Sequence, residues 1–185
     1  MTLPQTMTQV EITQPGGPEV LQPNQVPVPT PGPGEILIRV HAAGVNRPDV
    51  IQRAGKYPMK PGMSPIPGLE VAGEVVAIGQ GVTEFILGDS VCALTNGGGY
   101  AQYCVAPASQ ALPIPQGMDW LQAAAIPETF FTVWANLFDL GGASQGQRAL
   151  IHGGTSGIGT TALMLCREFA IKAFATAGSE DKCAA

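Results

Sequence analysis

The sequence predicts two units, a β-rich unit over residues 1–125 and an α/β unit over residues 126–185. Three observations indicate this division. Most of the 17 prolines lie in the first part, between short apolar runs, which is typical of strands joined by turns. The second part alternates helix-like and strand-like patterns. At its centre, the apolar run 149–151 leads into clustered glycines and then into a helical pattern.

Four strands are predicted in the first unit. The segment Glu35–Ala43 carries Ile36, Ile38 and Val40 on one face, and this alternation is typical of a half-buried strand. The same reasoning predicts strands over residues 71–78, 90–94 and 100–106. Asp119 is a candidate N-cap for a short helix through residue 125. Residues 128–140 are predicted as a second helix, which Gly141 and Gly142 end.

The second unit is predicted to be a βαβ unit. After the glycine-rich segment, Ile158, Ala162, Leu165 and Phe169 recur at helical spacing, and residues 173–177 form another small apolar strand. A parallel pair of strands is normally buried on both faces inside a larger sheet. We therefore expect either a fragment or a chain that has lost the remainder of its fold.

Composition limits the classes of partner. An apolar content of 45% is ample for a packed core. A net charge of −5 and a pI near 4.9 make nucleic acid and anionic membrane surfaces poor candidates for partners. The sequence has no apolar run of membrane-spanning length and no signal-peptide pattern at its start, so we expect a cytoplasmic protein.

The cysteines do not form a metal-binding pattern. They show no C-x-x-C pair, and neither His41 nor His152 stands at a zinc-ligand spacing from them. We expect no metal site and interpret all four as small apolar core residues, Cys92, Cys104, Cys166 and Cys183.

The glycine-rich segment is the strongest candidate site. A pyrophosphate can approach a backbone closely only where Cβ atoms are missing, and free N–H groups at a helix start can hold it. Gly154 and Gly159 keep the ends of the G-x-G-x-x-G fingerprint, while Ser156 occupies its middle glycine and can offer a hydroxyl to a phosphate oxygen. The alternative is a glycine-rich turn that binds nothing. The candidate phosphate-binding residues are Gly153, Gly154, Thr155, Ser156, Gly157, Ile158 and Gly159.

The end of the next predicted strand bears on the choice of cofactor. An acidic residue there would bind the ribose 2′-hydroxyl of NAD, but Gly178 and Ser179 occupy the position. Ser179 and Lys182 could instead hold a 2′-phosphate, so we predict NADPH rather than NADH. The acidic pair at 180–181 fits equally a solvated turn at a helix start.

Six further motifs accompany the glycine-rich segment along the chain, at residues 15–19, 43–49, 68–73, 88–91, 123–128 and 176–179. Their order resembles the medium-chain dehydrogenase/reductase superfamily, specifically its zinc-independent quinone oxidoreductases. The resemblance implies a GroES-like β-barrel catalytic domain followed by an incomplete Rossmann (βαβ) domain. It also favours a homodimer.

The resemblance implies chemistry without zinc. Zinc-dependent relatives have a zinc-ligating Cys where Asn46 stands and a zinc-ligating His where Leu69 stands, and residues 96–99 replace their structural zinc lobe. The implied activity is NAD(P)H-dependent reduction of quinones, or of related activated carbonyl or enone acceptors, by hydride or single-electron transfer. On this interpretation the nicotinamide supplies the chemistry and the protein supplies orientation.

Three further residues take candidate roles from the resemblance, each with a structural alternative. Asn46 would face the nicotinamide and the substrate, or would cap the next helix. Tyr57 would donate its hydroxyl to a quinone oxygen, or would pack on the barrel. Thr132 would reach the nicotinamide ribose or carboxamide, or would bond back to the preceding helical turn. Glu70 is interpreted as a structural hydrogen-bond acceptor.

The sequence has two rival interpretations. The glycine-rich segment also resembles the T-G-x-x-x-G-I-G loop of short-chain dehydrogenases, but the Tyr-x-x-x-Lys spacing of that family is missing. The other rival is a non-catalytic truncated remnant or a structural nucleotide-binding protein. We expect the 185-residue chain to have weak or no turnover unless a second chain completes its sheet.

Overall fold

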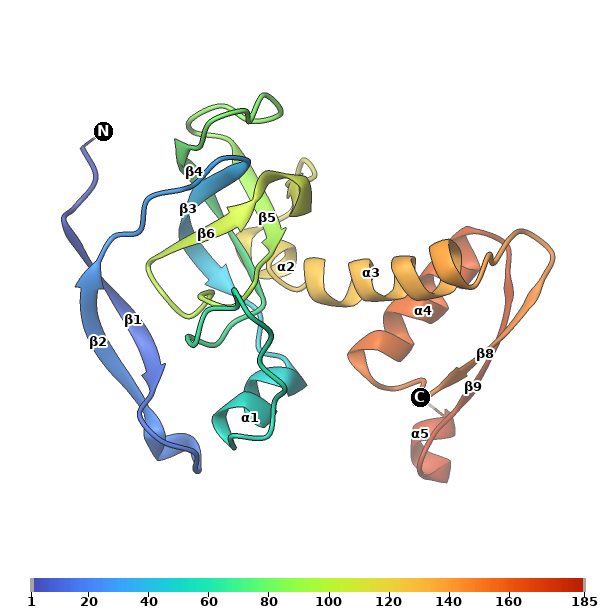
Figure 1. The fold of residues 1–185 in the computed structure, drawn as a ribbon. Helices are drawn as coiled ribbons and strands as arrows, with labels where there is room; N and C mark the ends of the chain where they lie inside the picture. Colours follow the sequence, from blue (N-terminus) through green and yellow to red (C-terminus); the bar gives the residue numbers. More distant parts are fainter. Residues whose placement is uncertain (1, 185) are drawn as a thin grey trace. The chain divides into compact units, whose positions relative to one another are not determined.

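The computed structural model describes residues 2–184 (Figure 1). The chain forms two compact units, the first ending at Pro127 and the second beginning at Glu128. None of the helices in residues 2–184 has the length and apolar character needed to cross a membrane.

The first unit contains a five-stranded antiparallel sheet, in the order β6-β3-β4-β5-β7. Two of the predicted strands, over 35–43 and 90–94, are confirmed at both ends, and the strand predicted from residue 71 begins one residue earlier. The three-residue β7 was not predicted. The strands are β3 (Glu35–Ala43), β4 (Glu70–Ile78), β5 (Ser90–Leu94), β6 (Tyr103–Pro107) and β7 (Ala111–Pro113).

The predicted start of β6 at residue 100 is wrong, because the residues before Tyr103 bond to another strand. The Tyr100 carbonyl oxygen accepts a hydrogen bond from the Val10 N–H at 2.8 Å, and the Gln102 N–H donates to the Thr8 carbonyl oxygen at 3.0 Å. Val10 and Thr8 belong to β1 (Thr6–Ile12), which forms an antiparallel hairpin with β2 (Leu21–Pro27) around the short 3₁₀ turn η1 (Pro18–Val20). This hairpin was not predicted. β1 does alternate, with Val10 and Ile12 alternating with polar Gln9 and Glu11, but β2 contains Pro23 and Pro27 and has no alternation.

Alternating side chains build the core of the first unit. Ile36, Ile38, Val71, Val75 and Val91 are fully buried and belong to one cluster. Each such side chain contributes about 1.5–3 kcal/mol when it leaves water. A second cluster joins Ala72 and Cys92 of the sheet to Ala123 and Ala124. The small side chains in this second cluster let a helix lie close to the sheet.

That helix is α2 (Trp120–Ala123), and its start confirms the predicted cap. The Asp119 carboxylate accepts a hydrogen bond from the Gln122 N–H at 2.8 Å, and the Gln122 side chain accepts one from the Asp119 N–H at 3.2 Å. This reciprocal pair is a capping box. A further helix of the first unit, α1 (Arg47–Arg53), follows Asn46, and a 3₁₀ turn, η2 (Ala108–Gln110), precedes β7.

In the second unit, the helix predicted over residues 128–140 is confirmed, with one difference in its winding. It begins as α3 (Pro127–Val133) and continues as a π-helical segment, η3 (Trp134–Leu140). The Gly141 N–H donates to the Asn136 carbonyl oxygen, five residues back, at 3.0 Å. Gly142 then adopts a φ of +63°, a conformation that favours glycine, and the helix ends there.

The predicted βαβ unit is confirmed in β8 (Arg148–His152), α4 (Gly157–Glu168) and β9 (Lys172–Thr176), followed by α5 (Glu180–Ala184). Strands β8 and β9 are parallel, and His152 pairs with Thr176. Ala162 and Cys166 of α4 are buried, whereas Ile158 and Phe169 of the predicted apolar stripe are about 40% exposed. Leu150 and Phe174, which pair across the strands, are 60% and 48% exposed.

Candidate functional site

The glycine-rich loop joins β8 to α4 and is tied to the end of β9. Gly153 has a φ of +73°, which favours glycine, and turns the chain immediately after β8. The Gly154 N–H donates to the Thr176 carbonyl oxygen at 2.8 Å. A Cβ at residue 154 would lie 2.6 Å from the Ala175 Cβ, so only glycine fits against β9 at this point.

Gly159 allows the first turn of α4 to approach the loop. A Cβ at this position would lie 2.3 Å from the Gly153 carbonyl oxygen and 2.7 Å from the carbonyl carbon of Gly154. Both contacts are with backbone atoms, which cannot rotate away. Steric contacts thus explain why the two ends of the fingerprint, Gly154 and Gly159, are glycine.

Ser156 is the N-cap of α4. Its Oγ accepts a hydrogen bond from the Gly159 N–H at 3.0 Å, and its own N–H donates to the Gly153 carbonyl oxygen at 2.9 Å. These two bonds occupy one acceptor position of the hydroxyl and the main-chain donor of the residue. The Ser156 hydroxyl donates no hydrogen bond to any residue from 2 to 184, so its hydrogen is available to a ligand.

Three main-chain donors are left over around the helix start. The N–H groups of Gly157 and Ile158 lie in the first turn of α4, where no helical partner exists. Within residues 2–184, neither these groups nor the Thr155 N–H donates a hydrogen bond. Together with the partial positive charge at a helix N-terminus, they can bind an anion.

A cavity of about 430 Å³ brings this loop together with the end of β9 and with α5. Of the predicted cofactor-binding residues, Gly154, Thr155 and Lys182 line it. Gly178 and Ser179 connect β9 to α5, and the Ser179 Oγ accepts a hydrogen bond from the Lys182 N–H at 3.4 Å. The remaining lining residues are Thr160, Leu163, Ala175, Thr176, Ala177 and Cys183.

Cys183 corrects one expectation. Its thiol is exposed rather than part of a core, because none of the described residues of α5 is buried. The other three cysteines, Cys92, Cys104 and Cys166, are buried as expected. No cluster of three or more His, Cys, Asp or Glu side chains suited to a metal ion occurs in residues 2–184. Chemistry without a metal stays a prediction.

In the first unit, Asn46 is held at both its backbone and its side chain. It is the N-cap residue of α1 and forms a capping box with Asp49, in which its side chain faces the Asp49 N–H and its own backbone N–H donates to Asp49 Oδ2 at 2.8 Å. Its side-chain Nδ2 donates to Glu70 Oε1 at 2.7 Å. Both carboxylates are buried, at 5% exposure for Asp49 and 3% for Glu70. The sequence did not indicate this network, because residue 70 is remote from residue 46 along the chain.

Asp49 links three segments of the first unit. Besides Asn46, it accepts hydrogen bonds from the Gly68 N–H at 3.1 Å and from the Tyr100 hydroxyl at 3.0 Å. Burial, the charge of Asp49 and its hydrogen bond, and the charge of Glu70 raise the pKa of Tyr100 well above its ordinary value. Tyr100 therefore acts as a neutral donor that helps to satisfy the buried Asp49 carboxylate.

The other two predicted residues lie in different units. Tyr57 is half-buried in the loop that follows α1 in the first unit. Thr132 is half-buried in α3 of the second unit, and its carbonyl oxygen accepts a hydrogen bond from Asn136 Nδ2 at 2.8 Å. Their roles toward a cofactor or a substrate stay predictions.

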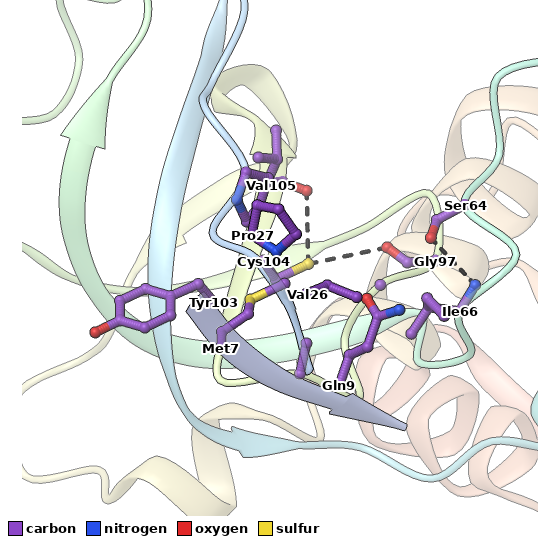
Figure 2. Close-up of a pocket in the computed structure, with 13 residues that line it drawn as sticks. Met7, Gln9, Val26, Pro27, Ser64, Ile66, Gly97, Tyr103, Cys104 and Val105 are labelled. Carbon is purple, nitrogen blue, oxygen red and sulfur yellow. Dashed lines mark hydrogen bonds between the residues drawn. The ribbon is translucent and has the colours of Figure 1, made fainter. Parts of the chain in front are cut away.

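A second cavity, of about 370 Å³, lies in the first unit between β1, β2 and the segment that leads into β6 (Figure 2). Most of its walls are apolar, and no predicted site residue lines it. Cys104 faces the carbonyl oxygens of Val105 and Gly97, at 3.6 and 3.9 Å from its Sγ. Burial raises the pKa of this thiol to about 12, so it stays protonated and unreactive at neutral pH.

The chain is similar to known proteins over both of its units. Residues 32–116 match the family model of the alcohol dehydrogenase GroES-like domain. The quinone oxidoreductase of Rattus norvegicus is 37% identical over 177 residues, which are 95% of this chain and 54% of that protein. The chain thus spans about half the length of the curated relatives it matches.

Two solved structures extend the comparison. The human synaptic vesicle membrane protein VAT-1 homolog-like protein superposes with a TM-score of 0.86 at 31% identity, covering 97% of this chain and 58% of that one. A mycobacterial protein complexed with NADPH superposes with a TM-score of 0.82 at 32% identity, covering 96% of this chain and 55% of that one.

Proposed function

Because this chain belongs to the quinone oxidoreductase family of the medium-chain dehydrogenase/reductase superfamily, we propose that it binds NADPH and serves the reduction of quinones. Related activated carbonyl or enone compounds are further acceptors under this proposal. Its fold supports the proposal, since a GroES-like domain precedes a βαβ part of a Rossmann domain. The NADPH complex of a similar mycobacterial protein supports the choice of cofactor.

The observation that carries the proposal is the start of α4. Three main-chain N–H groups there have no partner in residues 2–184. They lie beside two glycines, and a Cβ added at either glycine would collide with neighbouring atoms. A pyrophosphate needs this combination of close backbone approach and free donors. The residues therefore fit the group. Thr155, Gly157 and Ile158 would hold it through their N–H groups, and Ser156 through its hydroxyl.

The preference for NADPH rests on the far end of the same cavity. Residues 177–179 are Ala, Gly and Ser, so no carboxylate stands where NAD-binding proteins have the acid that accepts from the 2′-hydroxyl. Lys182 lines the cavity and carries the positive charge that a 2′-phosphate would need. Ser179 would add a hydroxyl, and Gly178 leaves open space, since nothing lies within 4 Å of a Cβ built there.

The chain's own residues would orient the reactants. The reduced nicotinamide, when bound, supplies the hydride or the electrons. Asn46 would face the nicotinamide and the acceptor, and Thr132 would reach the nicotinamide ribose or carboxamide. The Tyr57 hydroxyl would donate a hydrogen bond to the acceptor oxygen. An amide at residue 46 and an aliphatic side chain at residue 69 offer neither the thiolate nor the imidazole that zinc prefers. The reaction proposed here therefore proceeds without zinc.

One observation favours a second candidate function, nucleotide binding without turnover. The paired side chains of Leu150 and Phe174 are about half exposed on the two-stranded sheet. Parallel sheets are normally covered on both faces. A βαβ unit with an exposed sheet face can still present the loop amides to a nucleotide. Under the first proposal, by contrast, the chain forms a homodimer that covers this exposed face of the sheet.

Two measurements on the purified chain test the proposal. NADPH at 100 times its Kd should stabilise the fold by about 2.7 kcal/mol, seen as a rise in Tm. With a quinone present, absorbance at 340 nm should fall at a rate proportional to chain concentration. A rise in Tm with a flat absorbance trace would favour binding without turnover. No rise in Tm and no loss of absorbance would refute the proposal, and native mass spectrometry would show whether chains pair.

A further inference from the structure

Glu70 is a buried carboxylate to which the proposed function gives no role. It begins β4, is 3% exposed, and accepts a hydrogen bond from Asn46 Nδ2 at 2.7 Å. A buried charged group is costly unless hydrogen bonds compensate for the water it loses. The burial of the Glu70 carboxylate against Asn46, a candidate site residue, therefore needs an explanation.

The backbone leaves room for this carboxylate. A Cβ at Gly44 would lie 2.0 Å from Glu70 Oε1, so a side chain at residue 44 would displace the carboxylate from Asn46. The Gly44 N–H also donates to the Glu70 carbonyl oxygen at 3.2 Å. Gly44 thus fixes the start of β4 and opens the space that brings Oε1 to the Asn46 amide.

A second carboxylate holds the backbone of the same residue. Asp49 accepts from the Asn46 N–H at 2.8 Å and is itself held by the Gly68 N–H and the Tyr100 hydroxyl. The side chain of Asn46 is held at both ends of its amide: its oxygen faces the Asp49 N–H in the capping box, and its Nδ2 donates to Glu70.

We propose that Glu70 is a positioning residue that fixes which end of the Asn46 amide faces a ligand. An ionised carboxylate only accepts hydrogen bonds, so it binds Nδ2 and repels Oδ1. The amide therefore cannot exchange its two ends, and Oδ1 is directed away from Glu70. Oδ1 binds hydrogen-bond donors.

This orientation limits the kind of chemical group that the Asn46 side chain can bind. A donor group, such as the carboxamide nitrogen or a ribose hydroxyl of the nicotinamide half of NADPH, complements Oδ1. A quinone oxygen, which only accepts, does not. Resting on the proposed function, the inference assigns Asn46 to the cofactor rather than to the acceptor.

The first test needs no cofactor. In ¹⁵N-edited NMR spectra of the free chain, the Asn46 side-chain amide, assigned by its loss in Asn46→Ala, should show one downfield, slowly exchanging proton. Glu70→Met should return this resonance to a free-amide position, and Glu70→Gln, whose carbonyl still accepts, should largely retain it. Glu74→Gln, a change on the same strand outside the network, is the control and should leave the resonance in place. A free-amide resonance in the unmodified chain would overturn the proposal, even if the variants failed to fold.

The second test is a double-mutant cycle on NADPH affinity. Glu70→Met should weaken binding about tenfold, the loss expected for a hydrogen bond to a charged group. The double variant with Asn46→Ala should bind no more weakly than Asn46→Ala alone, because Glu70 acts through Asn46. Additive losses would contradict the proposal. If the unmodified chain does not bind NADPH, the proposed function fails while the NMR result still decides the orientation of Asn46.

Discussion

At the residue scale, the glycines of the loop from 153 to 159 differ in what they contribute. Gly153 supplies a positive φ, whereas Gly154 and Gly159 supply the absence of a Cβ where neighbouring atoms lie too close. Gly157 is less restricted, since a Cβ there would make an ordinary contact of 3.4 Å with Thr129 Cγ2. The fingerprint predicted Gly154 and Gly159, because their roles depend on local geometry. It could not reveal the Asn46 and Glu70 pair, because that contact depends on tertiary folding.

Gly159→Ala should damage both the loop and its ligand binding. The new methyl group would meet the Gly153 carbonyl oxygen, so the loop must move. We expect at least about a tenfold loss of NADPH affinity, and a destabilisation of about 1–3 kcal/mol, typical of overpacking. Isothermal titration and thermal unfolding measure these effects. Met164→Ala, in the same helix with a 46% exposed side chain, is the control. Unchanged affinity in Gly159→Ala would contradict the role given to the loop.

Lys182→Ala should change the choice of cofactor rather than binding in general. The Lys182 ammonium is the cation that lines the cavity at its α5 end and would pair with a 2′-phosphate. Removing it should weaken NADPH binding about tenfold, as expected for a charge-assisted contact, and should leave NADH binding nearly constant. The ratio of the two dissociation constants is the measurement. Equal losses for both cofactors would exclude a 2′-phosphate contact.

At the element scale, helix starts and strand ends were predicted where side chains and backbone interact locally. The Asp119 cap needed only residues 119–122, and the ends of β3 and β5 followed from apolar alternation and turns. The start of β6 was wrong because residues 100–102 bond to β1, which is remote in sequence. The hairpin itself was missed because its second strand contains two prolines and lacks an alternating pattern, although Val10 and Ile12 alternate with polar residues in the first strand.

Ser156 combines helix capping with a proposed phosphate contact, and two substitutions separate them. Ser156→Ala removes the acceptor for the Gly159 N–H and should cost about 1 kcal/mol of stability. Ser156→Asp keeps an acceptor for capping but adds a negative charge beside the proposed pyrophosphate. It should retain stability in urea denaturation and lose NADPH affinity by more than Ser156→Ala does. The opposite ranking in affinity would contradict a phosphate at this position.

Tyr100 makes the stability of the first unit decrease at alkaline pH. Its pKa is raised by burial and by the Asp49 and Glu70 carboxylates, so the native state keeps a proton that the unfolded chain loses near pH 10. This stabilisation is complete below that pH and is lost as the pH rises above it. Urea denaturation between about pH 9 and 11 should show a steeper decline for the unmodified chain than for Tyr100→Phe. Tyr103→Phe, which removes another hydroxyl, is the control. Parallel curves for the chain and Tyr100→Phe would refute this role.

At the scale of the whole molecule, the two-part architecture followed from periodicity, because strand and helix patterns change near residue 125. The family followed from the order of motifs, which the GroES-like match over residues 32–116 and the quinone oxidoreductase relatives bear out. Exposure could not be predicted in the same way. Leu150, Phe174 and Cys183 have core-type side chains that the described structure leaves exposed, since few elements surround β8, β9 and α5.

The central claim is that main-chain amides at the start of α4 bind the pyrophosphate of NADPH. The most direct measurement is a ¹H–¹⁵N NMR titration of the whole chain with NADPH. The account predicts saturable shifts that are largest at the amides of Thr155, Gly157 and Ile158. Saturable shifts centred elsewhere, or no shifts at millimolar NADPH, would contradict it.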